Sequence, residues 1–168
     1  DGVEIGVNPE VVTRGGQGLR ALVEAEGLHL FSIPPTLLPI PGWREKRDGL
    51  HRTVRLAQEA GAGVLVVHTP GSVTLEAGFG LAFCREIEGW QARLAGGTLR
   101  LAIENKALLG PDDAGLALTP LHRLRAFADR YDLGLVLDTT HAGSAGEDIL
   151  AARRLFDGRL LNVHLSDL

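Results

Sequence analysis

The sequence predicts an α/β fold, an incomplete parallel (β/α)8 TIM barrel with about six βα units in its 168 residues. Three observations lead to this prediction. Short apolar runs alternate strictly with segments of helical period. Several runs are apolar nearly throughout, which suits the strands of a parallel sheet covered on both faces. Finally, nearly every run ends in a polar residue, and the strands of a β/α barrel all end on one face.

Six apolar runs rich in Val, Leu and Ile are predicted as strands. Their starts are spaced about 25 to 36 residues apart, which leaves room for one helix after each strand. In chain order, the predicted strands are Val3–Gly6, Leu28–Ile33, Val64–His68, Leu99–Glu104, Leu133–Asp138 and Leu160–Leu165.

Five segments between these strands have helical periodicity. They are Leu19–Glu26, a helix through Leu50, Val54, Ala57 and Ala60, the segment Leu81–Leu94 around Cys84, Leu121–Tyr131, and Ile149–Phe156. Thr119 followed by Pro120 predicts a helix N-cap and first turn, and glycines at 27, 61, 96 and 158 stand where helices should end. The proline-rich stretch Ile33–Trp43 is predicted to be a long loop over the active face of the barrel.

Composition excludes several classes of protein. The chain is 45% hydrophobic and 23% charged, and its net charge of −4 gives no global basic field for nucleic acid or anionic membrane. No apolar run approaches the ~20 residues that span a bilayer, so a cytoplasmic protein without a membrane partner is expected. The single cysteine, Cys84, excludes an internal disulfide and a cysteine metal cluster, and it is predicted to be a buried thiol. The chain has no methionine and stops after an apolar run, so truncation at both ends is expected.

Nucleotide-binding motifs of an open sheet do not account for the pattern. The nearest glycine-rich match, Gly78-Phe79-Gly80, lacks a third glycine and follows no predicted strand. P-loop and GxSxG motifs are missing as well. A barrel is therefore favoured over a doubly wound sheet.

Oxygen and nitrogen donors collect at the predicted strand ends. In order, these residues are Glu4, Ser32, His68, Glu104, Asp138 with His141, and His164 with Asp167. Asp, Glu and His together suit Mn, Mg, Co, Fe or Zn, and a carboxylate-rich set favours the harder ions. A single strand-end Glu or His is commonly only a solvated loop residue, but the repetition favours a shared metal site. The other histidines, His29, His51 and His122, are interpreted as structural.

The segment DTTHAGSAGED from Asp138 resembles the signature of the xylose isomerase-like TIM-barrel superfamily, which includes sugar isomerases, epimerases and the endonuclease IV family. The motifs GVEI, VVHTPG, AIEN and NVHLSD, which contain Glu4, His68, Glu104 and His164, agree in order and spacing. The resemblance covers essentially the whole chain. It implies one partial TIM-barrel domain over residues 1–168, with barrel strands two to seven present and strands one and eight missing.

This resemblance implies a divalent-metal-dependent isomerase or epimerase acting on a sugar or sugar phosphate. Glu104, Asp138 and His164 would bind one ion of Mn, Mg, Co or Zn, together with a glutamate from the missing eighth strand. His141, His68 and Glu4 would contact the substrate. Glu104 would also be the base that moves a proton next to a carbonyl, whose developing negative charge the metal stabilises.

Two alternatives remain open from the sequence. An endonuclease IV-like enzyme would cut DNA at abasic sites with three zinc ions, and His68, Glu104, Asp138, His141 and His164 would all be ligands. Against it, the second strand ends Ser32-Ile33-Pro34-Pro35 where that family has a zinc histidine, and the loops lack an evident aromatic and arginine set for DNA. The other alternative is a non-catalytic barrel. Six βα units would also leave two unpaired strand edges, so association, including a homo-oligomer, is expected.

Overall fold

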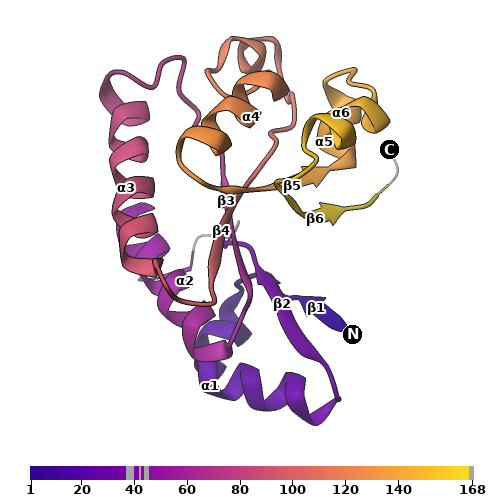
Figure 1. The fold of residues 1–168 in the computed structure, drawn as a ribbon. Helices are drawn as coiled ribbons and strands as arrows, with labels where there is room; N and C mark the ends of the chain where they lie inside the picture. The colour runs from indigo at the N-terminus through magenta and orange to yellow at the C-terminus, as the bar shows by residue number, and fades with distance from the viewer. Residues whose placement is uncertain (37–39, 42, 44–45, 167–168) are drawn as a thin grey trace. The chain divides into compact units, whose positions relative to one another are not determined.

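The structure is a computed structural model that describes residues 1–36, 40–41, 43 and 46–166, with only the backbone described for 46–50. Asp167 and part of the predicted proline-rich loop therefore lie outside the described residues. Figure 1 shows strands alternating with helices along the chain. The chain divides into two compact units, residues 1–67 with 97–100 and residues 68–96 with 101–168, and each is described by itself.

The first unit contains three parallel strands in sequence order. They are β1 (Gly2–Glu4), β2 (His29–Ile33) and β3 (Val64–His68), of which the last residue belongs to the second unit. β1 pairs with β2 with Glu4 opposite Ser32, and β2 pairs with β3 with Ser32 opposite Val64. The first strand was predicted at Val3–Gly6. In the structure it begins one residue earlier, at Gly2, and ends at Glu4.

Two helices belong to this unit, α1 (Pro9–Ala25) and α2 (Lys46–Ala60). α1 is longer than the predicted Leu19–Glu26. Its N-cap is Asn8, whose side chain accepts a hydrogen bond from the backbone N–H of Val11 at 3.0 Å. Gly15 interrupts the helical geometry with φ of 72°, and this break in a glycine-rich stretch explains why the periodicity began only beyond it.

The second unit has its own three-stranded parallel arrangement. β4 (Arg100–Glu104, from Leu101 onward in this unit), β5 (Gly134–Asp138) and β6 (Leu160–His164) follow one another in sequence order. β5 is buried and apolar up to its last residue, and β4 is buried and apolar between the exposed Arg100 and the buried Glu104. The register places Glu104 opposite Val136 and Asp138 opposite His164. Adjacent strands thus bring their terminal polar residues to one edge.

The helices of this unit are α3 (Gly78–Leu94), α4 (Leu121–Arg130), α5 (Thr139–Ser144) and α6 (Ile149–Leu155), with a short 3-10 helix at Pro111–Gly115. α3, α4 and α6 confirm the prediction, whereas α5 and the 3-10 helix were not predicted. Cys84 is buried in α3, as expected.

The predicted Thr119 N-cap is wrong. Pro120 occupies the N-cap of α4, and the Thr119 hydroxyl instead donates to the carbonyl of Asp113 at 2.7 Å.

Strand order confirms the predicted fold class. Within each unit, consecutive strands pair in parallel, and each strand before β6 is followed by a helical connection, as in a β/α barrel and unlike a doubly wound sheet, whose strand order reverses. The six strands correspond to the predicted incomplete barrel. Among the described residues, no helix has both the length and the apolar character needed to cross a membrane.

Candidate metal centre

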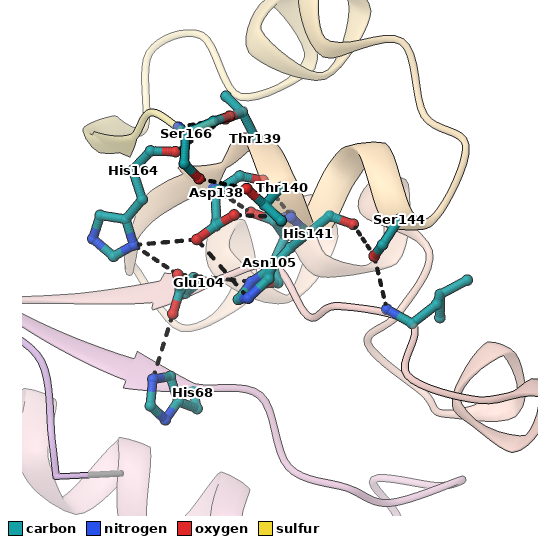
Figure 2. A network of polar contacts seen from close by, with 11 residues as sticks. His68, Glu104, Asn105, Asp138, Thr139, Thr140, His141, Ser144, His164 and Ser166 are labelled. Atoms are coloured by element: carbon teal, nitrogen blue, oxygen red, sulfur yellow. Dashed lines mark hydrogen bonds and ion pairs between the residues drawn. The ribbon is translucent and has the colours of Figure 1, made fainter. Parts of the chain in front are cut away.

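Four of the predicted site residues are the last residues of their strands. His68 ends β3, Glu104 ends β4, Asp138 ends β5 and His164 ends β6. All four belong to the second unit, so their mutual geometry is defined within it. Figure 2 shows the side chains of Glu104, Asp138 and His164 pointing toward one another.

Glu104 lies in the middle of this group and is only 5% exposed. Its Oε1 atom lies 2.7 Å from Nδ1 of His164 and 3.8 Å from Nδ1 of His141. Its Oε2 atom faces the other way, 3.4 Å from Nε2 of His68. The two oxygens of one carboxylate therefore face two different sets of imidazoles (Figure 2).

His141 reaches the centre because α5 begins directly after β5. Asp138 is the N-cap of α5, and its Oδ1 atom accepts a hydrogen bond from the backbone N–H of His141 at 2.8 Å. One helical turn thus places the His141 ring beside the carboxylate, with Nε2 3.9 Å from Oδ2 of Asp138. Glu104, Asp138 and His141 each offer one ligand atom, and these atoms all lie within 4.8 Å of one another.

His164 contacts both carboxylates of this triad. Besides the 2.7 Å contact with Glu104, its Nδ1 atom lies 3.7 Å from Oδ2 of Asp138. The three ligands predicted from the sequence, Glu104, Asp138 and His164, are therefore brought together, and His141 lies with them. We call these four residues the ligand cluster. Its carboxylate and imidazole donors are of the types that bind Mn, Mg, Co or Zn, so the residues fit a divalent ion.

His68 differs electrostatically from a free histidine. Partial burial lowers its pKa below the usual value, and the neighbouring imidazoles of His141 and His164 add to this effect, while the Glu104 carboxylate opposes it. His68 is therefore neutral at neutral pH. A neutral imidazole beside a carboxylate oxygen is suited to donating a hydrogen bond to a substrate or offering a lone pair to a metal.

Asn105, directly after Glu104, was not singled out from the sequence, although it ends the AIEN motif. It is buried, and its side chain makes two hydrogen bonds to the backbone of Asp138. Thr139, directly after Asp138, was also missed. Its buried hydroxyl bonds to backbone atoms of His164 and Ser166. Only the position of each residue next to a predicted ligand could have indicated these roles.

The structure also locates the other strand-end residues and the histidines interpreted as structural, each within its own unit. Glu4 and Ser32 belong to the first unit, where the Ser32 hydroxyl donates to Oε2 of Glu4, and the role of Glu4 as a substrate contact stays a prediction. His29 is the exposed first residue of β2, at the opposite end of that strand from Ser32 and Ile33. His51 lies in α2 and His122 in α4, as predicted.

Solved structures of similar fold include two epimerase-related proteins and one isomerase-domain protein. The 3-keto-D-glucoside 4-epimerase of E. coli in its apo form aligns with a TM-score of 0.67 and 15% identity, over 94% of this chain and 66% of that one. A xylose isomerase domain containing protein from Salmonella typhimurium gives 0.66 and 19%, over 100% and 62%. A D-tagatose 3-epimerase-like protein gives 0.66 and 15%, over 99% and 67%.

At these identities the likeness establishes the fold alone, and the chain spans 62–67% of the length of these structures. No curated protein matches the sequence. The sequence does match one family profile, described as xylose isomerase-like TIM barrel, over residues 1–168. Fold, strand order and this match agree, and the chain belongs to the xylose isomerase-like TIM-barrel family.

Proposed function

We propose that the protein is a divalent-metal-dependent isomerase or epimerase that acts on a sugar or sugar phosphate by moving a proton next to a carbonyl. The observation that carries this proposal is the placement of Glu104. It is a buried carboxylate at a strand end, with His141 and His164 near one of its oxygens, His68 near the other, and a ligand atom of Asp138 within 4.8 Å. The similar folds of two epimerase-related proteins support the same class.

The ligand cluster supplies the residues that would hold the metal. We propose Glu104, Asp138 and His164 as the principal metal ligands. His141 is a fourth possible ligand, because its ring lies close to both carboxylates. When bound, a divalent ion would polarise the substrate carbonyl and lower the free energy of the negative charge that forms on its oxygen. Asp138 additionally caps the start of α5, because its Oδ1 atom accepts a hydrogen bond from the backbone N–H of His141.

Glu104 is the residue proposed to move the proton. Its carboxylate takes a proton from the carbon next to the carbonyl, and the electron pair of the broken C–H bond passes into the carbonyl group. In an isomerisation the proton is then returned to the former carbonyl carbon, while the hydroxyl proton of the neighbouring carbon passes to the former carbonyl oxygen. In an epimerisation Glu104 keeps the proton, and a second acid delivers another to the opposite face of the same carbon, a role proposed for the eighth-strand glutamate that the family resemblance implies. Oε2 is the better placed of the two oxygens to take the proton, because Oε1 is already in contact with Nδ1 of His164. His68, beside Oε2, is proposed to bind the substrate hydroxyl or carbonyl.

Deuterium exchange tests this proposal, because it reports proton transfer on any sugar that the enzyme accepts. The natural protein, loaded with Mn²⁺, is incubated in D2O with a panel of aldoses, ketoses and their phosphates, and mass spectrometry detects deuterium on carbon. We expect incorporation into at least one sugar, and a loss of about 100-fold or more in Glu104→Gln at saturating Mn²⁺. His122→Asn, in α4 and outside the ligand cluster, is the matched control and should exchange like the wild type.

Retained exchange in a folded Glu104→Gln protein would exclude Glu104 as the base. Exchange into no sugar of the panel, with no bound metal, would instead favour the non-catalytic barrel.

A second candidate, an endonuclease IV-like nuclease, is favoured by one observation. His68 lies 3.4 Å from Oε2 of Glu104, so Glu104 could share its two oxygens between ions on its two sides. Metal analysis separates the candidates, because one ion per chain supports proton transfer and three zinc ions support the nuclease. Cleavage of an abasic-site duplex by the zinc-loaded protein, without deuterium exchange, would establish the second candidate.

A further inference from the structure

We propose that Asn105 and Thr139 are positioning residues that set the spacing between the ligand residues of β4, β5 and β6. This inference rests on the metal centre of the proposed function. Each of the two residues directly follows a strand-end ligand, Glu104 or Asp138. Each uses its side chain to hold the backbone at or beside the ligand of the next strand, Asp138 or His164 (Figure 2).

Asn105 extends the pairing of β4 with β5 by one step. The ladder ends with Glu104 opposite Val136, and the Asn105 backbone N–H still reaches the Val136 carbonyl at 3.4 Å. Beyond Asn105 the backbone pairing is continued by the side chain of Asn105, which bonds to the backbone of Asp138. Oδ1 accepts the backbone N–H of Asp138 at 2.7 Å, and Nδ2 donates to the Asp138 carbonyl at 3.1 Å. Both ends of one amide group therefore hold the one residue that supplies the second carboxylate.

The backbone of Asn105 also orients His141. Its carbonyl lies 2.8 Å from Nδ1 of His141, and because a carbonyl can only accept, Nδ1 must carry the hydrogen. In the neutral ring the lone pair then lies on Nε2, the atom near Oδ2 of Asp138. A hydrogen bond from one ring nitrogen to a carbonyl is the usual way in which a protein orients a metal-binding histidine.

Thr139 makes the corresponding connection between β5 and β6. Pairing of these strands ends with Asp138 opposite His164. Directly beyond it, the Thr139 hydroxyl accepts the backbone N–H of Ser166 at 3.1 Å and donates to the Ser166 carbonyl at 2.8 Å, with the His164 carbonyl 3.3 Å away. Thr139 is buried, so water does not compete freely for these bonds. The segment that carries His164 is thereby held to the residue next to Asp138.

The two residues could instead serve only the stability of the fold, and the test must separate the two roles. Asn105→Ala removes both bonds to Asp138. Thr139→Val keeps the side-chain shape and removes the hydroxyl, whereas Thr139→Ser keeps the hydroxyl. Leu124→Ala, in the core of α4 and outside the ligand cluster, lowers stability without touching these bonds.

Isothermal titration with Mn²⁺ is performed on the natural protein and on each variant. We expect the dissociation constant to rise about 10- to 100-fold in Asn105→Ala and in Thr139→Val, the range typical of residues that orient metal ligands. Thr139→Ser and Leu124→Ala should bind like the wild type, although Leu124→Ala unfolds at a lower temperature. Hydrogen exchange of the metal-free proteins gives a second readout. The Asp138 amide should exchange faster in Asn105→Ala, and the Ser166 amide faster in Thr139→Val only.

The outcomes distinguish this inference from the proposed function. If the wild type binds Mn²⁺ and both variants bind it equally well, the positioning role is wrong and the metal centre stands. If the affinity for Mn²⁺ falls in Leu124→Ala as much as in Asn105→Ala and Thr139→Val, the loss is explained by lower stability of the fold. That result would overturn the inference. A wild-type protein with no affinity for Mn²⁺ would overturn the proposed function, and this inference with it.

Discussion

Nδ1 of His164 lies 2.7 Å from Oε1 of Glu104, although the two residues are 60 positions apart in the chain. An ionised carboxylate can only accept a hydrogen bond, so in the absence of metal this contact places a proton on Nδ1. A metal bound by the same nitrogen would take the place of that proton. If His164 binds the metal, we expect Nδ1 to be the ligand atom, because it faces both carboxylates, 2.7 Å from Oε1 of Glu104 and 3.7 Å from Oδ2 of Asp138.

Single alanine substitutions of His164 and His141 should therefore differ in their effects. If His164 is a ligand and His141 mainly a substrate contact, His164→Ala should raise the Mn²⁺ dissociation constant by more than the roughly 10- to 100-fold of a residue that only orients ligands. His141→Ala should raise it less, while weakening substrate binding. Titration calorimetry measures both affinities, with His122→Ala as a control that should bind like the wild type. The reverse order would make the triad of Glu104, Asp138 and His141 the principal ligand set.

Two glycines of α3 should respond to alanine in opposite directions. A Cβ atom at Gly80 would lie 1.9 Å from the backbone carbonyl oxygen of Thr74, whereas one at Gly89 would have nothing within 4 Å. Gly80→Ala must displace the backbone and should cost about 1–3 kcal/mol of stability. Gly89→Ala, at an exposed helical position, should add about 0.5–1 kcal/mol because alanine loses less entropy in a helix. Urea unfolding measures both changes, and equal effects would contradict the close approach.

Much of the fold could be predicted from the sequence because its strands carry two signals at once. β3, β4 and β5 are nearly continuous buried apolar runs, and each ends at the predicted polar residue, His68, Glu104 or Asp138. The predicted bounds of β1 were shifted because this strand has only three residues, two exposed and one half-buried, which carry little of this signal. α5 was missed because six residues, two of them threonine and one glycine, are too few to display a helical period.

The convergence of the candidate ligand residues could be predicted from the sequence, but the residues that support them could not. The side chains of Glu104, Asp138 and His164 carry donor atoms of the types that bind metals. The strands of a β/α barrel all end on one face, so residues at those ends are expected to lie together. Asn105 acts through hydrogen bonds to a backbone 33 positions away, and no local pattern encodes such a contact. The direction in which each oxygen of Glu104 faces is likewise a property of side-chain packing across strands.

The connection after β4 contains an ion pair whose effect should depend on pH. Asp113 accepts a hydrogen bond from Lys106 Nζ at 2.7 Å and others from the backbone N–H groups of Leu109 and Gly110 at 2.9 and 3.2 Å. The Lys106 bond is the largest of the causes that hold the pKa of Asp113 below its usual value near 3.8. Lys106→Met should therefore raise the pKa of Asp113 toward that value. Carboxyl NMR titration measures the shift.

Because the pKa of Asp113 is lower in the folded protein than in the unfolded chain, its ionised form stabilises the fold above the usual pKa. That stabilisation is lost as the pH falls through the folded-state pKa. The difference in melting temperature between wild type and Asp113→Asn should be full at neutral pH and should shrink below about pH 4. Asp129, whose pKa is lowered by Arg125 and Arg159, is the internal control and should titrate unchanged in Lys106→Met. A difference that stayed constant down to strong acid would mean that Asp113 stabilises the connection through packing and neutral hydrogen bonds instead of its charge.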